Sequence, residues 1–400
     1  MIRTCSLLLC ACLWAGCQVG PSLEACDIRD DSCRQDIVLA VQYVRGTGWD
    51  PWIDPPPMRV ITKDQYRAEI EASQKPSSQQ PDSYDYYTPA YKLFAMFDPD
   101  EAMDAATSFT VSFVAAYYDG STDTITVIDR GGDTNLQADT ATLAHELVHA
   151  AQQRDIGFQT IYSWSRTIDN GNAVGSLVEG EARLYENLIY AMMNKLTPED
   201  IDWARYHDDW VAGTRKSIAK DASPWRLARS VLRYPLGSRY LTTAWLDGGP
   251  LAVRRAWADH PTATRRLMAA RGSSIDVPDE ELPCAAPETP ADFKGIVSTS
   301  LGAWAVYAFG TRIASEPEAW DFGTARVADR FTIFAADDKR LAVVWQLQFD
   351  SEEHASNFTN ALAQLPDKVH VKSGRDGRSV NLYSASDFEA VPEFAWDGCR

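Results

Sequence analysis

Hydrophobic and polar positions alternate along the first third of the chain in a pattern typical of strands. Thr alternates with Ile and Val over residues 124–128, and the turn residues 119–121 join this run to a β-branched and aromatic run over residues 110–118. This pattern predicts a β-hairpin. Residues 58–62 predict a further short strand, followed by a helix that begins near Asp64.

A helical period follows the predicted hairpin. Leu143, Leu147, Val148 and Ala151 lie three or four residues apart, so they predict a helix that is capped at residue 139 or 140 and ends near residue 154. Further helices are predicted over residues 175–194, 198–220, 238–244 and 250–271.

The last third of the chain contains both the alternation typical of strands and the three-to-four-residue spacing typical of helices. Residues 271–290 are rich in Pro, Asp and Glu and indicate a connector. Beyond it, helices are predicted over residues 295–313 and 351–365, and strands over 331–334, 342–349, 369–372 and 379–383. We therefore predict an α+β fold with two parts, residues 18–280 and a C-terminal accessory region over residues 281–400.

The N-terminus has the pattern of a secretory signal. Arg3 precedes an apolar run over residues 5–15, which at about 11 residues is shorter than the ~20 needed to cross a bilayer. Residues 13–17 resemble a bacterial lipoprotein cleavage site, which implies that residues 1–17 are a signal peptide and that Cys17 carries a lipid. Simple secretion, or a cut within residues 9–12, is the alternative. Either way, the chain is expected to be exported, to the bacterial cell envelope or beyond it.

Cysteine usage agrees with export. Four of the eight cysteines fall in the predicted signal, which leaves an even number, and four cysteines allow three pairings. We favour Cys26–Cys33 as a local loop and Cys284–Cys399 as a long-range tie; the alternative is that some remain free thiols.

Composition limits the partners. Hydrophobic residues make up 45% and charged residues 24%, which is ordinary for a globular protein and too polar for a membrane bundle. The formal net charge of −18 argues against a broad basic face, so no nucleic-acid partner is expected.

The sequence His145-Glu146-Leu147-Val148-His149 carries the clearest chemistry. Two histidines four apart project from one helix face, where both imidazoles can reach one tetrahedral metal ion. Glu146 lies one step around the helix, where its carboxylate can take a proton from a water. The alternative is an unrelated histidine pair on a helix.

A third ligand is expected from the predicted helix over residues 175–194. Glu179 and Glu181 are two residues apart, so they point about 200° away from each other and only one faces the histidines. The small residues Gly180 and Ala182 would let the two helices approach closely. We assign Glu179 as the ligand and regard Glu181 as a solvated carboxylate or one that supports a ligand. Two histidines, a glutamate and an open position form the ligand set of a catalytic zinc.

These motifs resemble those of a known family. The HELVH sequence at 145–149 and VEGEA at 178–182 resemble the gluzincin branch of zinc metallopeptidases, and with residues 114–119 and 124–128 they resemble a group of exported bacterial proteins. The resemblance covers roughly residues 58–245, with Arg154 where Gln is common. It implies a zincin-like metallopeptidase core, with a short sheet over a helical active-site body and a C-terminal α+β extension. It also implies Zn²⁺, a peptide or protein substrate, and a substrate-binding edge at residues 124–128, for which an interior strand without a free edge is the alternative.

Peptide hydrolysis also needs a group that stabilises the oxyanion. The family's Tyr-x-x-Gly stretch is matched by Tyr234 to Gly237, so Tyr234 is the first candidate, with Tyr240 and His207 as the others. A buried core tyrosine is the alternative for either tyrosine. Four histidines are expected at the surface: His207, His260, His354 and His370. Asp155 or Asp169 is expected to orient a ligand histidine.

The sequence thus predicts zinc-dependent hydrolysis of peptide bonds, with zinc on His145, His149 and Glu179 and with Glu146 and Tyr234 as catalytic residues. Two alternatives stay open. One is an envelope scaffold that binds zinc without turnover. The other is an interaction protein whose C-terminal region is the working part.

Overall fold

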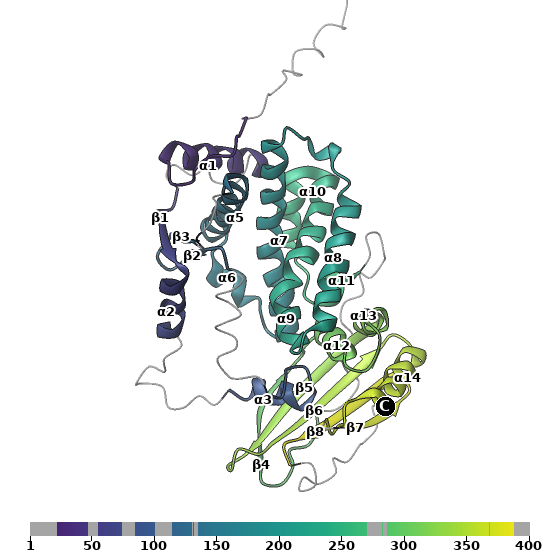
Figure 1. Ribbon diagram of the computed structural model, residues 1–400. Coiled ribbons are helices and arrows are strands. Elements are labelled where there is room, and N and C mark those ends of the chain that lie inside the picture. The colour runs from purple at the N-terminus through teal and green to yellow at the C-terminus, as the bar shows by residue number, and fades with distance from the viewer. Residues whose placement is uncertain are drawn as a thin grey trace, which may run out of the picture.

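The computed structural model is a mixed α+β protein with a helical part and two separate sheets (Figure 1). This confirms the predicted fold class at that level. The structure describes residues 22–46, 55–73, 85–100, 114–129, 131, 135–269, 282, 286–367 and 369–387. The predicted signal over residues 1–17 and the predicted Cys284–Cys399 pair lie outside these ranges. Among the described residues, no helix has the length and apolar character needed to cross a membrane.

The small sheet has three strands: β1 (Met58–Thr62), β2 (Ala116–Asp119) and β3 (Thr124–Asp129). β2 and β3 form the predicted antiparallel hairpin, and the predicted helix after β1 is α2 (Lys63–Ser73). The expectation of a free edge at residues 124–128 is wrong. β1 pairs with β3 in parallel on its other side, so β3 is the central strand and β2 is an edge strand.

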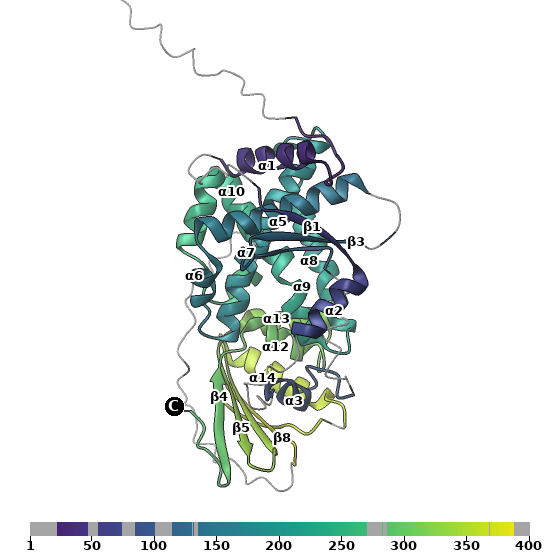
Figure 2. The same ribbon diagram turned by 90° about the vertical axis from the view of Figure 1, so that its left-hand side faces the viewer.

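Four long helices form the body beside this sheet: α5 (Leu136–Asp155), α7 (Ile168–Met193), α8 (Trp203–Lys220) and α10 (Arg233–Ala258). In Figure 2 the small sheet faces the viewer, with α5 and α7 behind it. α5 begins earlier than expected, because the Asn135 side chain accepts the Ala138 backbone N–H at 3.1 Å and caps the helix. The proposed cap residue Thr140 is instead buried inside the helix.

α7 and α10 approach each other at two glycines. A Cβ atom added at Gly180 would lie 2.3 Å from the carbonyl carbon of Gly237, and one added at Gly237 would lie 1.9 Å from the Ser176 carbonyl oxygen. Both distances are far shorter than a van der Waals contact, so the helices can pack this closely only because neither residue has a side chain. Gly180 was expected to bring the helix of Glu179 close to the helix of the histidines; it faces Gly237 of α10 instead.

The larger sheet is antiparallel, in the order β4-β5-β6-β8-β7. Its strands are β4 (Phe293–Thr299), β5 (Arg326–Ala336), β6 (Leu341–Phe349), β7 (Lys372–Asp376) and β8 (Ser379–Ala385). The single helix predicted over residues 295–313 is wrong: β4 occupies its first part, and α12 (Ala303–Gly310) begins only after Gly302. Gly302 has φ +86°, a conformation that interrupts a helix. The strand predicted over 369–372 is also misplaced, because β7 begins at Lys372.

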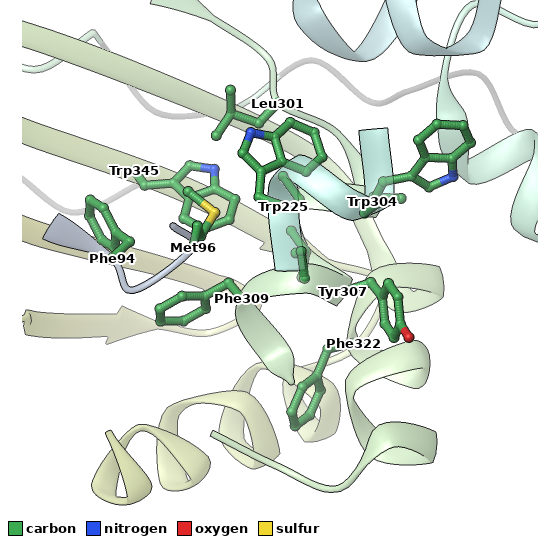
Figure 3. Packing of buried hydrophobic residues seen from close by; sticks show 14 of the residues in the cluster. Phe94, Met96, Trp225, Leu301, Trp304, Tyr307, Phe309, Phe322 and Trp345 are labelled. Atoms are coloured by element: carbon green, nitrogen blue, oxygen red, sulfur yellow. The ribbon is translucent and has the colours of Figure 1, made fainter. Parts of the chain in front are cut away.

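A core rich in aromatic residues joins the larger sheet to the helical body. It includes Trp225 of α9 (Pro224–Val231), Trp304 of α12 and Trp345 of β6, which are all fully buried (Figure 3). Phe94, just after α3 (Tyr87–Leu93), contacts the Trp345 ring edge-on at 5.9 Å between centroids. A segment between β1 and β2 therefore packs into the C-terminal core, while the proposed division near residue 280 stays a prediction.

Buried charges also cross this junction. Arg326 on β5 pairs with Asp329 on the same strand and with Asp169 at the start of α7, at 3.4 Å. All three side chains are buried. Asp169 also accepts the Thr264 backbone N–H at 2.9 Å, so the start of α7 is held by hydrogen bonds as well as by charge.

The first described helix, α1 (Asp31–Arg45), packs against α5 and α7. The predicted Cys26–Cys33 disulfide is present and closes the loop that leads into α1. The last residue of α1, Arg45, is buried and reaches the helical body. A segment far from the histidines in sequence is thereby fixed to their helix.

Candidate metal centre

His145 and His149 lie on one face of α5, as their spacing predicted. Both side chains are largely buried, and their ring centroids are 4.8 Å apart. α7 places Glu179 opposite them, with Oε2 at 3.4 Å from His145 Nε2 and 3.6 Å from His149 Nε2. One atom from each residue lies within 4.8 Å of the others, so the group could hold a metal ion.

Each imidazole has a hydrogen-bond partner at Nδ1, which fixes the orientation of its ring. His145 Nδ1 lies 2.8 Å from Glu186 Oε2, and His149 Nδ1 lies 3.0 Å from Gln152 Oε1. With Nδ1 engaged in this way, each Nε2 faces Glu179. The expectation that Asp155 or Asp169 orients a histidine is wrong, because Asp155 pairs with Arg45 at 3.0 Å and Asp169 bonds Thr264.

The charges around the histidines favour a cation. Burial lowers the pKa of His145, but the hydrogen bonds and charges of Glu179 and Glu186 outweigh burial and raise that pKa to about 10. Burial raises the pKa of Glu179, but the two imidazoles lower it by more. The net effect is a lowered pKa, so Glu179 is a carboxylate. Glu179 Oε2 is buried, and among the described residues it faces the two imidazoles at 3.4 and 3.6 Å without a hydrogen bond of regular geometry. A donor set of this kind, surrounded by carboxylates, fits a metal ion.

Glu146 lies beside this group and is 5% exposed. Burial raises its pKa, although the charges of His145 and His149 act in the opposite direction. A carboxylate with a raised pKa in such a position can take a proton and give it back, which is the property of a general base.

Of the three candidates for the oxyanion group, the structure brings Tyr234 next to His145 of the candidate centre. Its ring is 6.3 Å from the His145 ring, and burial with the charges of Glu179 and Glu146 raises its pKa, so its hydroxyl stays protonated. Tyr240 packs instead between the two hydrophobic cores, beneath Arg266.

The histidines outside the site differ in exposure. His207 was expected at the surface, but it is 3% exposed and lines a cavity of about 240 Å³ between α8 and α10. The expectation failed because the polar run around His207 covers only the outer face of α8. His260 is half-buried against Trp164, at 4.4 Å between ring centroids. His354 is half-exposed beside Asp350, and His370 is exposed.

Glu186 and Gln152, which bind the two histidines, were not predicted from the sequence. Glu186 lies two helical turns after Glu179, and Gln152 lies one turn after His149, so helical spacing alone could have suggested both. Glu181, which was expected to be solvated or to support a ligand, is fully buried and binds Arg45, Gln152 and Trp257.

The edge strand β2 is linked to the histidines through aromatic rings. It contacts α5, and its Tyr118 ring lies 6.2 Å from the Phe158 ring, which is in turn 6.4 Å from the His149 ring. β2 is therefore an edge strand in contact with the helix of the candidate centre.

The chain matches no family model, no curated protein and no solved structure.

Proposed function

We propose that this protein is a zinc-dependent hydrolase of peptide bonds with a zincin-like core of the gluzincin type. The observation that carries the proposal is the convergence of three buried donor atoms, from His145, His149 and Glu179, while both Nδ1 atoms are held by outward partners. Two nitrogens and one oxygen with an open position are the ligands of a catalytic zinc site.

The ion's contribution in a site of this kind is to acidify water and to polarise a carbonyl group. Glu146, buried beside the ligands, would accept the proton of the attacking water and return it to the leaving amine. The Tyr234 hydroxyl, which its surroundings keep protonated, would donate a hydrogen bond to the oxygen on which negative charge develops.

The substrate would be a peptide or protein in extended form. Among the described strands, β2 lies at the edge of its sheet beside α5, and an extended peptide can add to such an edge through main-chain hydrogen bonds. Export, with a lipid on Cys17 in the bacterial envelope or as a secreted protein, is the proposed location.

Metal content and turnover, measured on the same protein, test the proposal. We expect one zinc per chain and cleavage within a mixed peptide library. Glu146→Gln should keep the zinc and lose about 10²–10⁴-fold in kcat, since the base is removed but no ligand is. Tyr234→Phe should also keep zinc and lose about 10²-fold or more in kcat with little change in KM.

Two outcomes contradict the proposal. A wild-type protein that holds no zinc when zinc is supplied would make the histidine pair structural. Zinc binding without cleavage by wild type would favour the scaffold function instead, because the metal site would then serve the fold alone.

A further inference from the structure

The hydrogen bonds of Gln152 allow one orientation of its side-chain amide. Gln152 is fully buried, and its Nε2 donates to the Val178 carbonyl oxygen at 3.0 Å and to Glu181 Oε2 at 2.9 Å. Glu181 receives donors on its other side too, from Arg45 at 3.1 Å and from the Trp257 indole N–H at 2.9 Å. Arg and Trp side chains can only donate, so the Glu181 carboxylate accepts from Gln152.

This arrangement decides the protonation of His149. The Gln152 NH₂ group donates both of its hydrogen bonds to acceptors on α7. Its carbonyl oxygen Oε1 therefore faces His149 Nδ1, at 3.0 Å. An oxygen cannot donate, so Nδ1 carries a proton, and Nε2, which faces Glu179, is the nitrogen left to bind a metal ion. We propose that Gln152, held by Val178 and Glu181, is a positioning residue that fixes the metal-binding tautomer of His149.

The same segment of α7 supplies both the ligand and the support. Glu179 points to the histidines, while its neighbour Val178 and the following Glu181 bind Gln152. A shift of α7 along α5 would therefore disturb a ligand and the tautomer of its partner together.

Arg45 completes the arrangement from the end of α1. Its guanidinium is 4% exposed and bridges Glu181 at 3.1 Å and Asp155 at 3.0 Å. Burying a carboxylate without a cation is strongly destabilising. The positive charge of Arg45 offsets this cost, so that Glu181 can stay ionised and accept from Gln152. The N-terminal helix thus acts on His149 through two intervening side chains.

This inference rests on the metal-binding part of the proposed function and not on peptide hydrolysis. The first experiment compares zinc affinity, by chelator competition, in wild type, Gln152→Leu and Trp257→Phe. Gln152→Leu should weaken zinc binding 10- to 100-fold, the usual effect of losing a group that orients a ligand. Trp257→Phe removes another hydrogen bond of Glu181 but leaves Gln152 in place. It should lower the melting temperature and keep zinc affinity within about twofold.

The second experiment needs no metal. The Glu179 carboxylate would accept a proton from His149 Nε2 in metal-free protein, so the measurement is made in Glu179→Ala protein. With ¹⁵N-labelled histidines, at a pH high enough to leave the imidazoles neutral, long-range ¹H–¹⁵N correlations distinguish the two tautomers. The His149 signals are identified by their loss when His149→Ala is added. Glu179→Ala should show the proton on Nδ1 of His149, and adding Gln152→Leu should shift it toward Nε2.

The two readouts separate the two proposals. A proton on Nε2 of His149 in Glu179→Ala protein, or wild-type zinc affinity in Gln152→Leu, would overturn the role of Gln152. A proton on Nδ1 in Glu179→Ala protein, together with a wild type that takes up no zinc, would support the role of Gln152 and contradict the proposed function.

Discussion

His207 is a titratable group that the proposed chemistry does not use. Its ring stacks on Trp203, at 6.1 Å between centroids, and neither ring nitrogen has a hydrogen-bond partner among the described residues. Burial lowers its pKa to about 4, with a further contribution from the positive charge of Arg239. The neutral form is therefore the one that the fold accommodates.

Acid should destabilise the fold through this residue. The ordinary pKa of histidine is about 6.5, so the unfolded chain binds a proton first as pH falls, and the free energy of unfolding drops between about pH 6.5 and pH 4. Between pH 7.5 and pH 5, wild type should lose on the order of 2 kcal/mol more than His207→Phe in urea unfolding. The exposed His370→Phe serves as control. Equal losses in wild type and His207→Phe would show that His207 is solvated.

Single residues were predictable where chemistry demands a fixed spacing. The four-residue interval of His145 and His149 and the opposed directions of Glu179 and Glu181 follow from helix geometry, and the structure places these residues as expected. The partners of the ligands were not predictable in the same way. Asp155 lies near the histidines in sequence, but its place was decided by Arg45, which is 110 residues away.

At the scale of elements, the contact between α7 and α10 sets the position of Glu179. Gly180 follows that ligand directly and lies against Gly237 of α10. The backbones meet here without side chains between them, so the distance between the two helices has no room to adjust. The candidate ligand is therefore held by a helix packed against another helix, and not by a loop.

A methyl group at Gly237 should separate these helices. Its Cβ would lie 1.9 Å from the Ser176 carbonyl oxygen, and a backbone atom cannot move aside as a side-chain end can. Gly237→Ala should cost about 3 kcal/mol or more in urea unfolding. Gly213→Ala, at a helical position with open space around it, should be neutral or stabilise by up to about 1 kcal/mol. Similar unfolding midpoints for both variants would contradict the close contact.

Helices and strands with one regular spacing of apolar residues were predicted well. Elements whose structure depends on partners distant in sequence were not. The hairpin of β2 and β3 follows from alternation and turn residues. β3 is the central strand because β1 pairs with it, and the residue pattern of a strand does not reveal which other strands pair with it. Residues 295–299 have apolar spacing that also suits a helix, and pairing with β5 makes them a strand.

At the scale of the whole molecule, Arg326 connects the helical body with the larger sheet. It is 1% exposed and faces Asp329 and Asp169, which are also buried. Burial raises the pKa of Asp329, but the Arg326 charge and hydrogen bonds from Ser300 and Trp345 outweigh it, so that pKa is lowered. Asp329 is therefore an anion that needs Arg326.

Arg326→Leu should leave these carboxylates without their cation and cost about 3–5 kcal/mol of stability in thermal or urea unfolding. Adding Asp329→Leu to that variant should recover part of the loss, since one buried charge is removed with the other. A fully additive double variant would mean that the two side chains do not interact.

The junction between the two parts has a consequence for the order of events during synthesis. Phe94 packs on Trp345, which leaves the ribosome roughly 250 residues later. At about 5–20 residues per second, the aromatic side chains around Phe94 wait on the order of 10 to 50 seconds for their partners. Until then they are an exposed apolar segment, of the kind that chaperones bind. A chain stopped before the larger sheet would keep that segment exposed permanently, and we expect it to aggregate.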